Sequence, residues 1–296
     1  MSTAAAQREQ IVADAIREIS HIATLPEITL KIVALVEDPK STAQDLHKVI
    51  ANDPALCSRI LKVVNSSFYG LPGQIGSINR AIVMLGLNAV KNIAIAASLA
   101  KLFRGGELTP SFSAKSLWMH SVVTAATCKM LSDRLGFAVS DEAFLSGLIH
   151  DIGIMVEMQA DRNKLIEVVQ RTGADKQGVP AMDMIEAEEA VFGVNHQQFG
   201  AGLCAKWKFP ANFANVTGYH HRPMELPAET RTLPCIVYVG DRLAAEVAGG
   251  FRLDLVNTAI AEPVLDFLKL TTDKINQLRQ DLPQHLKSVE TMLACH

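Results

Sequence analysis

His150 and Asp151 stand side by side in an otherwise apolar stretch, residues 146–153, whose sequence is SGLIHDIG. We expect this stretch to belong to a buried helix that begins near Ser140. Burying an imidazole beside a carboxylate costs free energy unless both groups find partners. The partners could be a hydrogen-bond network or a metal ion, and the other histidines of the chain bear on that choice.

Further candidate ligands occur in the second half of the chain, within helical segments or at their ends: His120, His196, His220, His221 and Asp241. Helical bundles build metal centres from imidazoles and carboxylates that project inward from several helices. Nitrogen and oxygen ligands without a thiolate suit iron, manganese, zinc or magnesium. A bound metal with open positions could activate water as a nucleophile and neutralise charge on a phosphoryl group.

Each of these positions also has a structural interpretation. A lone histidine on an apolar helix, such as His120, is more often a hydrogen-bonded core residue than a ligand. Asp241 could cap a helix or pair with Arg242, and the adjacent His220 and His221 could form a helix-end cluster favoured by the helix dipole. Seven residues of the right type in the right order favour the joint interpretation as a site.

Composition narrows the class of protein. A chain of 296 residues is long enough for one large domain or two modest ones. The net charge of −3 gives no basic surface, which argues against nucleic-acid binding. The five cysteines are scattered and form no C-x-x-C pair, which suits a reducing cytoplasm. The N-terminus lacks a signal pattern, and the most apolar stretch, 93–103, is too short to span a membrane.

Nearly every segment has helical periodicity, and strand signals are almost absent, so the sequence predicts an all-α, multi-helix bundle. Residues 104–110 form the clearest linker. We therefore expect an N-terminal helical subdomain (1–108) and a second helical subdomain (109–296) that carries the site. The expected helices are 4–20, 26–37, 43–51, 54–64, 77–103 with a break at 86–88, 113–136, 140–158, 161–172, 181–192, 195–207, 211–220 and 228–248, and then weaker helices beyond about Leu255 that cover the core.

The order His120, His150-Asp151, Asp241 resembles the H…HD…D pattern of the HD phosphohydrolase superfamily. The additional His196, His220 and His221 resemble the extra histidines of the HD-GYP branch, which hydrolyses cyclic di-GMP at a binuclear or larger metal site. The N-terminal motifs are similar to those of the HDOD family, an HD-related helical output domain of bacterial signalling. They are LP at 25–26, DPAL at 53–56, LKVVNS at 61–66, SINRAI at 77–82 and LG at 85–86.

The resemblance, which runs from about Ile22 to about Ala245, implies a ligand set and a function. One divalent ion, iron or manganese with zinc or magnesium as alternatives, would be held by His120, His150, Asp151 and Asp241. A second would be held by Asp151, His196, His220 and His221, with Asp151 as bridge and candidate catalytic residue. The resemblance implies a cytoplasmic bacterial signalling protein that keeps an HD-type metal site and acts through a signalling partner or a nucleotide or phosphoester ligand. Two alternatives remain: an active metal-dependent phosphohydrolase or phosphodiesterase, and a metal-free interaction module.

Some positions depart from the HD-GYP pattern. Ile154 and Met155 replace the lysine that usually follows the HD-I-G motif, and Arg222-Pro223 replaces the acid expected after the paired histidines. No Gly-Tyr-Pro loop follows, and Ser116 stands where some members place another carboxylate. These departures count against cyclic di-GMP hydrolysis, although Arg222 could still contact a phosphate.

Overall fold

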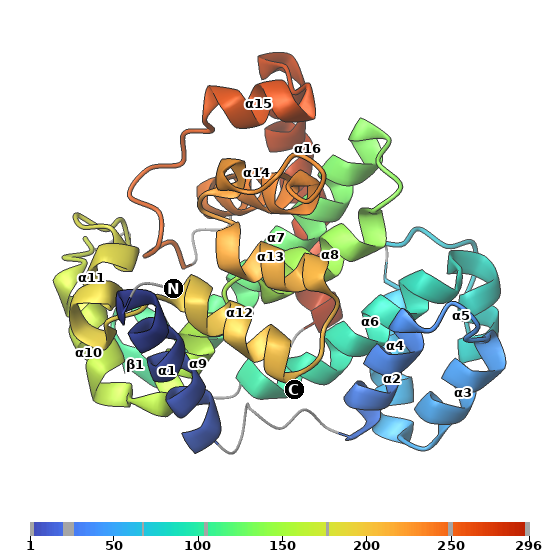
Figure 1. Ribbon diagram of the computed structural model, residues 1–296. Helices are drawn as coiled ribbons and strands as arrows, with labels where there is room; N and C mark the ends of the chain where they lie inside the picture. Colours follow the sequence, from blue (N-terminus) through green and yellow to red (C-terminus); the bar gives the residue numbers. More distant parts are fainter. Residues whose placement is uncertain are drawn as a thin grey trace.

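The computed structural model of the protein describes residues 3–19, 27–66, 68–103, 106–175, 178–247 and 251–293 (Figure 1). Helices make up nearly all of the regular structure in these ranges, which confirms the predicted all-α class. The N-terminal elements are α1 (Thr3–Glu18), α2 (Glu27–Glu37), α3 (Ala43–Ala51), α4 (Pro54–Val64), α5 (Ile78–Leu85), α6 (Leu87–Leu99) and the 3-10 turn η1 (Ala100–Phe103). The following elements are β1 (Glu107–Thr109), β2 (Phe112–Ser113), α7 (Ala114–Leu135), α8 (Ser140–Ile149), α9 (Ile152–Ala160), α10 (Arg162–Arg171), α11 (Met184–Phe192), α12 (His196–Lys206), α13 (Ala211–Tyr219), η2 (Pro223–Glu225), α14 (Thr232–Val247), α15 (Glu262–Leu268) and α16 (Thr272–Leu293).

Side-chain caps start the helices α3, α4 and α5. The oxygens of Thr42, Asp53 and Ser77 each accept a hydrogen bond from the backbone N–H three residues later. Such caps satisfy N–H groups that have no partner within the helix. Gly86, at φ 90°, separates α5 from α6, so the predicted break is confirmed.

Helix α7 lies at the centre of the C-terminal helices and packs against α8, α14 and α16 (Figure 1). One apolar cluster joins α2–α6 to α7–α12, and a second joins α7 to α14, α15 and α16. The apolar α6 is buried along nearly its whole length, and Trp118 of α7 packs against Phe103 with ring centroids 4.8 Å apart. The helices beyond Leu255 cover the core as expected.

The predicted helix over 140–158 is wrong at its centre, because it divides into α8 and α9 at His150 and Asp151. The Nδ1 of His150 lies 2.8 Å from the Gly147 carbonyl oxygen, and Asp151 leaves helical geometry at ψ 15°. The α-helical hydrogen bonding therefore stops where both side chains turn to the interior. Neither a glycine nor a proline stands at the break, so the local sequence gives no stop signal.

Three smaller differences concern segment boundaries. Residues 107–109 of the predicted linker pair as β1 with β2 in a short antiparallel ladder. Helix α11 begins at Met184 and α14 at Thr232, later than predicted. The motif LP at 25–26, linker residues 104 and 105, and Cys295 lie outside the described residues, and the subdomain division near residue 108 stays a prediction.

Candidate metal centre

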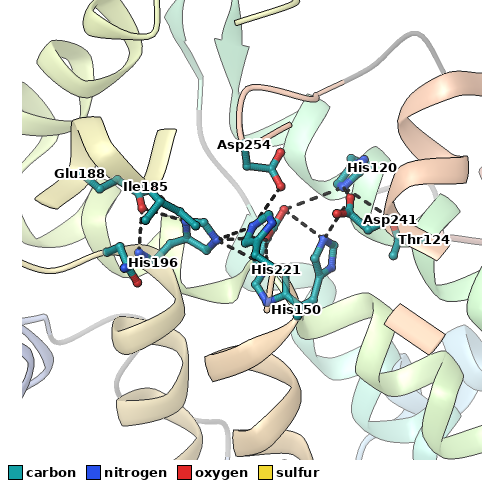
Figure 2. Close-up of polar contacts among 12 residues, drawn as sticks. His120, Thr124, His150, Ile185, Glu188, His196, His221, Asp241 and Asp254 are labelled. Carbon is teal, nitrogen blue, oxygen red and sulfur yellow. Dashed lines mark hydrogen bonds and ion pairs between the residues drawn. The ribbon is translucent and has the colours of Figure 1, made fainter. Parts of the chain in front are cut away.

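All seven side chains predicted as ligands come together between the C-terminal helices (Figure 2). Six of them are at most 1% exposed, and the His221 side chain is 9% exposed. They come from separate elements: His120 from α7, His150 and Asp151 from the turn between α8 and α9, His196 from the start of α12, His220 and His221 from the turn after α13, and Asp241 from α14.

Two glycines allow the helices around the site to approach closely. A Cβ on Gly153 of α9 would lie 1.9 Å from the His196 carbonyl oxygen, so only glycine fits where α9 meets the start of α12. A Cβ on Gly200 of α12 would lie 3.1 Å from the Cβ of Thr217 on α13, so these two helices also approach closely. The sequence therefore brings α9, α12 and α13 together with their ligands facing one another.

The first group of ligand atoms belongs to His120, His150 and Asp241, and these atoms lie within 4.8 Å of one another. The Nε2 of His120 is 3.0 Å from the Asp241 Oδ1, and the Nε2 of His150 is 3.8 Å from the same oxygen. The His150 Nε2 is also 3.1 Å from the Asp151 Oδ2. This group is mixed nitrogen and oxygen, as the sequence predicts.

The second group belongs to Asp151, His196, His220 and His221, again within 4.8 Å of one another. The Asp151 Oδ1 lies 3.3 Å from the His220 Nε2 and 3.8 Å from the His196 Nε2. Since the Oδ2 of the same carboxylate faces His150, Asp151 stands between the two groups.

The imidazoles of His150, His196 and His220 are oriented by hydrogen bonds at Nδ1. That atom lies 2.8 Å from the Gly147 carbonyl oxygen in His150 and 3.2 Å from the Val216 carbonyl oxygen in His220. In His196 it lies 2.8 Å from a Glu188 carboxylate oxygen. Because carbonyl and carboxylate oxygens accept, Nδ1 is the donor in each ring. The Nε2 of the neutral His196 and His220 rings then carries a lone pair, whereas the Asp151 carboxylate favours a proton on the Nε2 of His150.

The Nε2 atoms of the three histidines in the second group converge on one another. The His196 Nε2 lies 3.1 Å from the His221 Nε2 and 3.4 Å from the His220 Nε2. Within the described residues, neither oxygen of Asp151 or Asp241 accepts a hydrogen bond of good geometry. Facing lone pairs and buried carboxylates without donors are unfavourable by themselves, and a cation between them satisfies both. The donor set therefore fits a divalent metal.

Charge is distributed unevenly over the cluster. Burial opposes the charged form of His150, but the Asp151 carboxylate outweighs it and raises the pKa of His150 to about 9. Burial lowers the pKa of His220 to about 4 and also lowers the pKa values of His196 and His221. The second group is accordingly made of neutral imidazoles, the form that binds metals.

The sequence analysis missed two carboxylates at this site. Both oxygens of Glu188, on α11, approach the His196 Nδ1, and one of them also accepts the His196 backbone N–H at 3.0 Å. Asp254 follows α14, and its Oδ2 lies 3.4 Å from the His221 Nε2. Asp254 stands between two leucines, which is a signal in the sequence, whereas Glu188 is one of three glutamates in α11 and does not stand out.

Two other positions discussed above do not enter the cluster. Ser116 belongs to the capping box of α7, where it exchanges hydrogen bonds with Ser113. Arg222 is 44% exposed at its side chain, lies over the Tyr219 ring and is 3.5 Å from Glu225.

None of the helices described is both long enough and apolar enough to cross a lipid bilayer.

The HDOD domain model matches residues 22–223, more than half of the chain. The fold is similar to that of an HDOD domain protein of unknown function from Geobacter sulfurreducens, with a TM-score of 0.80, 21% identity, and 98% of this chain and 100% of that chain covered. It is also similar to a Shewanella amazonensis protein named a “putative metal-dependent phosphohydrolase”, with a TM-score of 0.61, 19% identity, and coverage of 96% and 99%. At these identities the likeness concerns the fold alone.

Among curated proteins, an uncharacterized protein of Treponema pallidum (strain Nichols) is 25% identical over 228 residues. The match covers 77% of this chain and 43% of the relative. The chain therefore spans less than half the length of the curated relative that it matches.

Proposed function

The chain belongs to the HDOD domain family, and from this premise we propose that it is a cytoplasmic bacterial signalling protein that binds one or two divalent metal ions. It acts through a signalling partner protein or through a nucleotide or other phosphoester bound at the metal site. The observation that carries the proposal is the convergence of imidazole lone pairs on buried carboxylates that lack hydrogen-bond donors.

Each group of ligand atoms would hold one ion. The first ion falls to His120, His150, Asp151 and Asp241, and the second to Asp151, His196, His220 and His221. Iron and manganese suit such a set of imidazoles and carboxylates, with zinc and magnesium as alternatives. When bound, the ions supply Lewis acidity toward water and phosphoryl oxygens.

The protein side chains orient the ligands and exclude water. Glu188 fixes the orientation of the His196 ring and makes its Nε2 a stronger electron-pair donor to a metal. Carboxylates that accept the other ring N–H of a metal-bound histidine generally have this effect. The carbonyl groups of Gly147 and Val216 do the same for His150 and His220. Burial of nearly every ligand keeps bulk water away and strengthens each electrostatic interaction.

A second candidate function is metal-dependent hydrolysis of a phosphomonoester or phosphodiester, including a cyclic dinucleotide. The position of Asp151 between the two groups favours it, because a shared carboxylate is typical of sites that clamp both sides of a phosphoryl transfer. The name of the Shewanella amazonensis neighbour agrees with this candidate. Asp151 would then be the catalytic residue.

Metal analysis combined with a turnover assay tests the two candidates together. Protein reconstituted with manganese or iron is desalted, its metal is counted, and it is challenged with cyclic dinucleotides and bis(p-nitrophenyl) phosphate. We expect the wild type and the surface control Asp133→Asn to bind metal. We expect His150→Ala and Asp151→Ala to bind none. Turnover that both alanine variants lose supports the hydrolase, whereas bound metal without turnover supports the regulatory function. Less than about a tenth of an equivalent of metal in the wild type rejects both and favours a metal-free interaction module.

A further inference from the structure

The segment 251–255, which follows α14, folds back over the cluster (Figure 2). Phe251, Leu253 and Leu255 are each at most 2% exposed and anchor the segment in the interior. The Phe251 ring packs against the His120 ring and against Phe112, both at 5.7 Å between centroids. The segment lies beyond the part of the chain that the HDOD domain model matches.

Asp254 is the one polar residue that this anchored segment directs at the histidines. It is 3% exposed, and its Oδ2 lies 3.4 Å from the His221 Nε2. One of its oxygens forms, with His221 and Asp241, a third group of ligand atoms within 4.8 Å of one another. In Figure 2 the carboxylate reaches the cluster from the side of this segment, between the two predicted groups.

The surroundings of Asp254 give it no structural role. Within the described part of the chain, neither of its oxygens accepts a hydrogen bond of good geometry. Arg242, whose charge acts on Asp254, stacks on the Tyr238 ring at 3.4 Å and donates to the carbonyl oxygens of Tyr238 and Ala259. A buried carboxylate without donors is costly, so its expected partner is a cation held by its neighbours.

The third group cannot be an independent site. The Nε2 of His221 can bind only one ion, and it already lies 3.1 Å from the Nε2 of His196 in the second group. Asp241 likewise belongs to the first group. Asp254 would therefore supply a further oxygen ligand to the ions that the two predicted groups hold.

We propose that Asp254 is an internal anionic ligand of the metal cluster and fills the position that a phosphate or phosphoester oxygen would take. The inference rests on the proposed function, because it requires metal at the site. Carboxylate and phosphate oxygens are hard anionic ligands that compete for the same cations. An incoming phosphoester must displace Asp254, and with it the segment 251–255, before it reaches the ions.

Binding of inorganic phosphate to manganese-loaded protein tests this inference. Wild type, Asp254→Asn and Asp266→Asn are loaded, their metal is counted, and phosphate is titrated by calorimetry at saturating manganese. An asparagine side chain has the shape of aspartate without its charge, and Asp266 is an exposed residue of α15 in the same region. We expect phosphate to bind about tenfold tighter to Asp254→Asn and as in the wild type to Asp266→Asn.

A gain of less than about threefold, or weaker phosphate binding, overturns the inference. Asp254→Ser provides the same test should the asparagine variant not fold. Absence of manganese from the wild type rejects the proposed function instead, so the two failures are distinguishable. The metal count, which is a readout independent of turnover, separates them.

Discussion

In the N-terminal helices, the polar side chains of Lys91 and Asn65 reach oxygens and N–H groups of the fold itself. The Nζ of Lys91 donates to the Leu35 carbonyl oxygen and to the Ser41 hydroxyl. Asn65 donates to the Ile75 carbonyl oxygen at 2.8 Å and accepts the Ile75 N–H at 2.6 Å. The contacts of Lys91, which is 2% exposed, compensate the cost of its burial within the protein.

At the centre of the C-terminal helices, the buried carboxylates of Asp151 and Asp241 face imidazole nitrogens in ion pairs but accept no hydrogen bond of good geometry. Asp151 and Asp241 are surrounded by imidazoles whose Nδ1 protons are mostly used elsewhere. The contrast teaches that α2–α6 are built to fold, whereas the cluster is built to bind something that the chain does not supply. Substitutions in the two regions should therefore separate metal binding from stability.

The largest effect is expected from Asp151→Asn, because this carboxylate contacts both groups of ligand atoms. Manganese affinity should fall by more than about 100-fold, beyond the cost of losing an orienting partner. Equilibrium dialysis with metal analysis measures it, and Asp133→Asn, a half-exposed carboxylate of α7, serves as control. Equal affinities in the two variants would contradict the assignment of Asp151.

Removal of metal from the wild type should lower its thermal stability. A ligand present at about 100 times its dissociation constant stabilises a protein by about 2.7 kcal/mol, which corresponds to about 5–10 °C in melting temperature. Scanning calorimetry with manganese and with a chelator measures the shift. Asp151→Asn should melt at the same temperature in both conditions, and a shift in that variant would mean that the metal binds elsewhere.

Glu188→Gln should have a smaller effect, because Glu188 acts through His196. Loss of such an orienting carboxylate typically weakens metal binding by about 10–100-fold. Metal titration of this variant should show that loss, whereas Glu186→Gln, an exposed residue of the same helix, should bind metal as the wild type does. Indistinguishable affinities would leave Glu188 with a purely structural role.

The smallest effect concerns the N-terminal helices. Asp53→Ala removes the N-cap of α4 and should lower the free energy of unfolding by about 1 kcal/mol without changing metal affinity. Asp53→Asn, which keeps a capping oxygen, should recover most of that stability. Denaturant unfolding gives the first quantity and dialysis the second. A change in metal affinity would show that the two regions are not separable in this way.

The helical class, most helix positions and the seven converging side chains could be predicted from the sequence. Periodicity fixes the apolar faces, and capping residues such as Asp53 and Ser77 act locally. His150 and Asp151 are conspicuous because they interrupt an apolar stretch. The periodicity and the caps depend only on residues close together in the chain, whereas the ligand set was predicted from the order of residue types between His120 and Asp241.

The remaining features depend on tertiary contacts. The break between α8 and α9 has no local stop signal and follows from the inward turn of His150 and Asp151. Glu188 and Asp254 gain their meaning only from His196 and His221, which reach them through helix packing. Spacing along the chain does not reveal such partners.

The most direct test of the account is the metal content of the wild-type protein after reconstitution with manganese or iron and removal of free metal. We expect one or two tightly bound ions per chain, because two groups of ligand atoms share Asp151. Retention of less than about a tenth of an equivalent with each metal would contradict it. The buried imidazoles and carboxylates would then have to be explained without a cation.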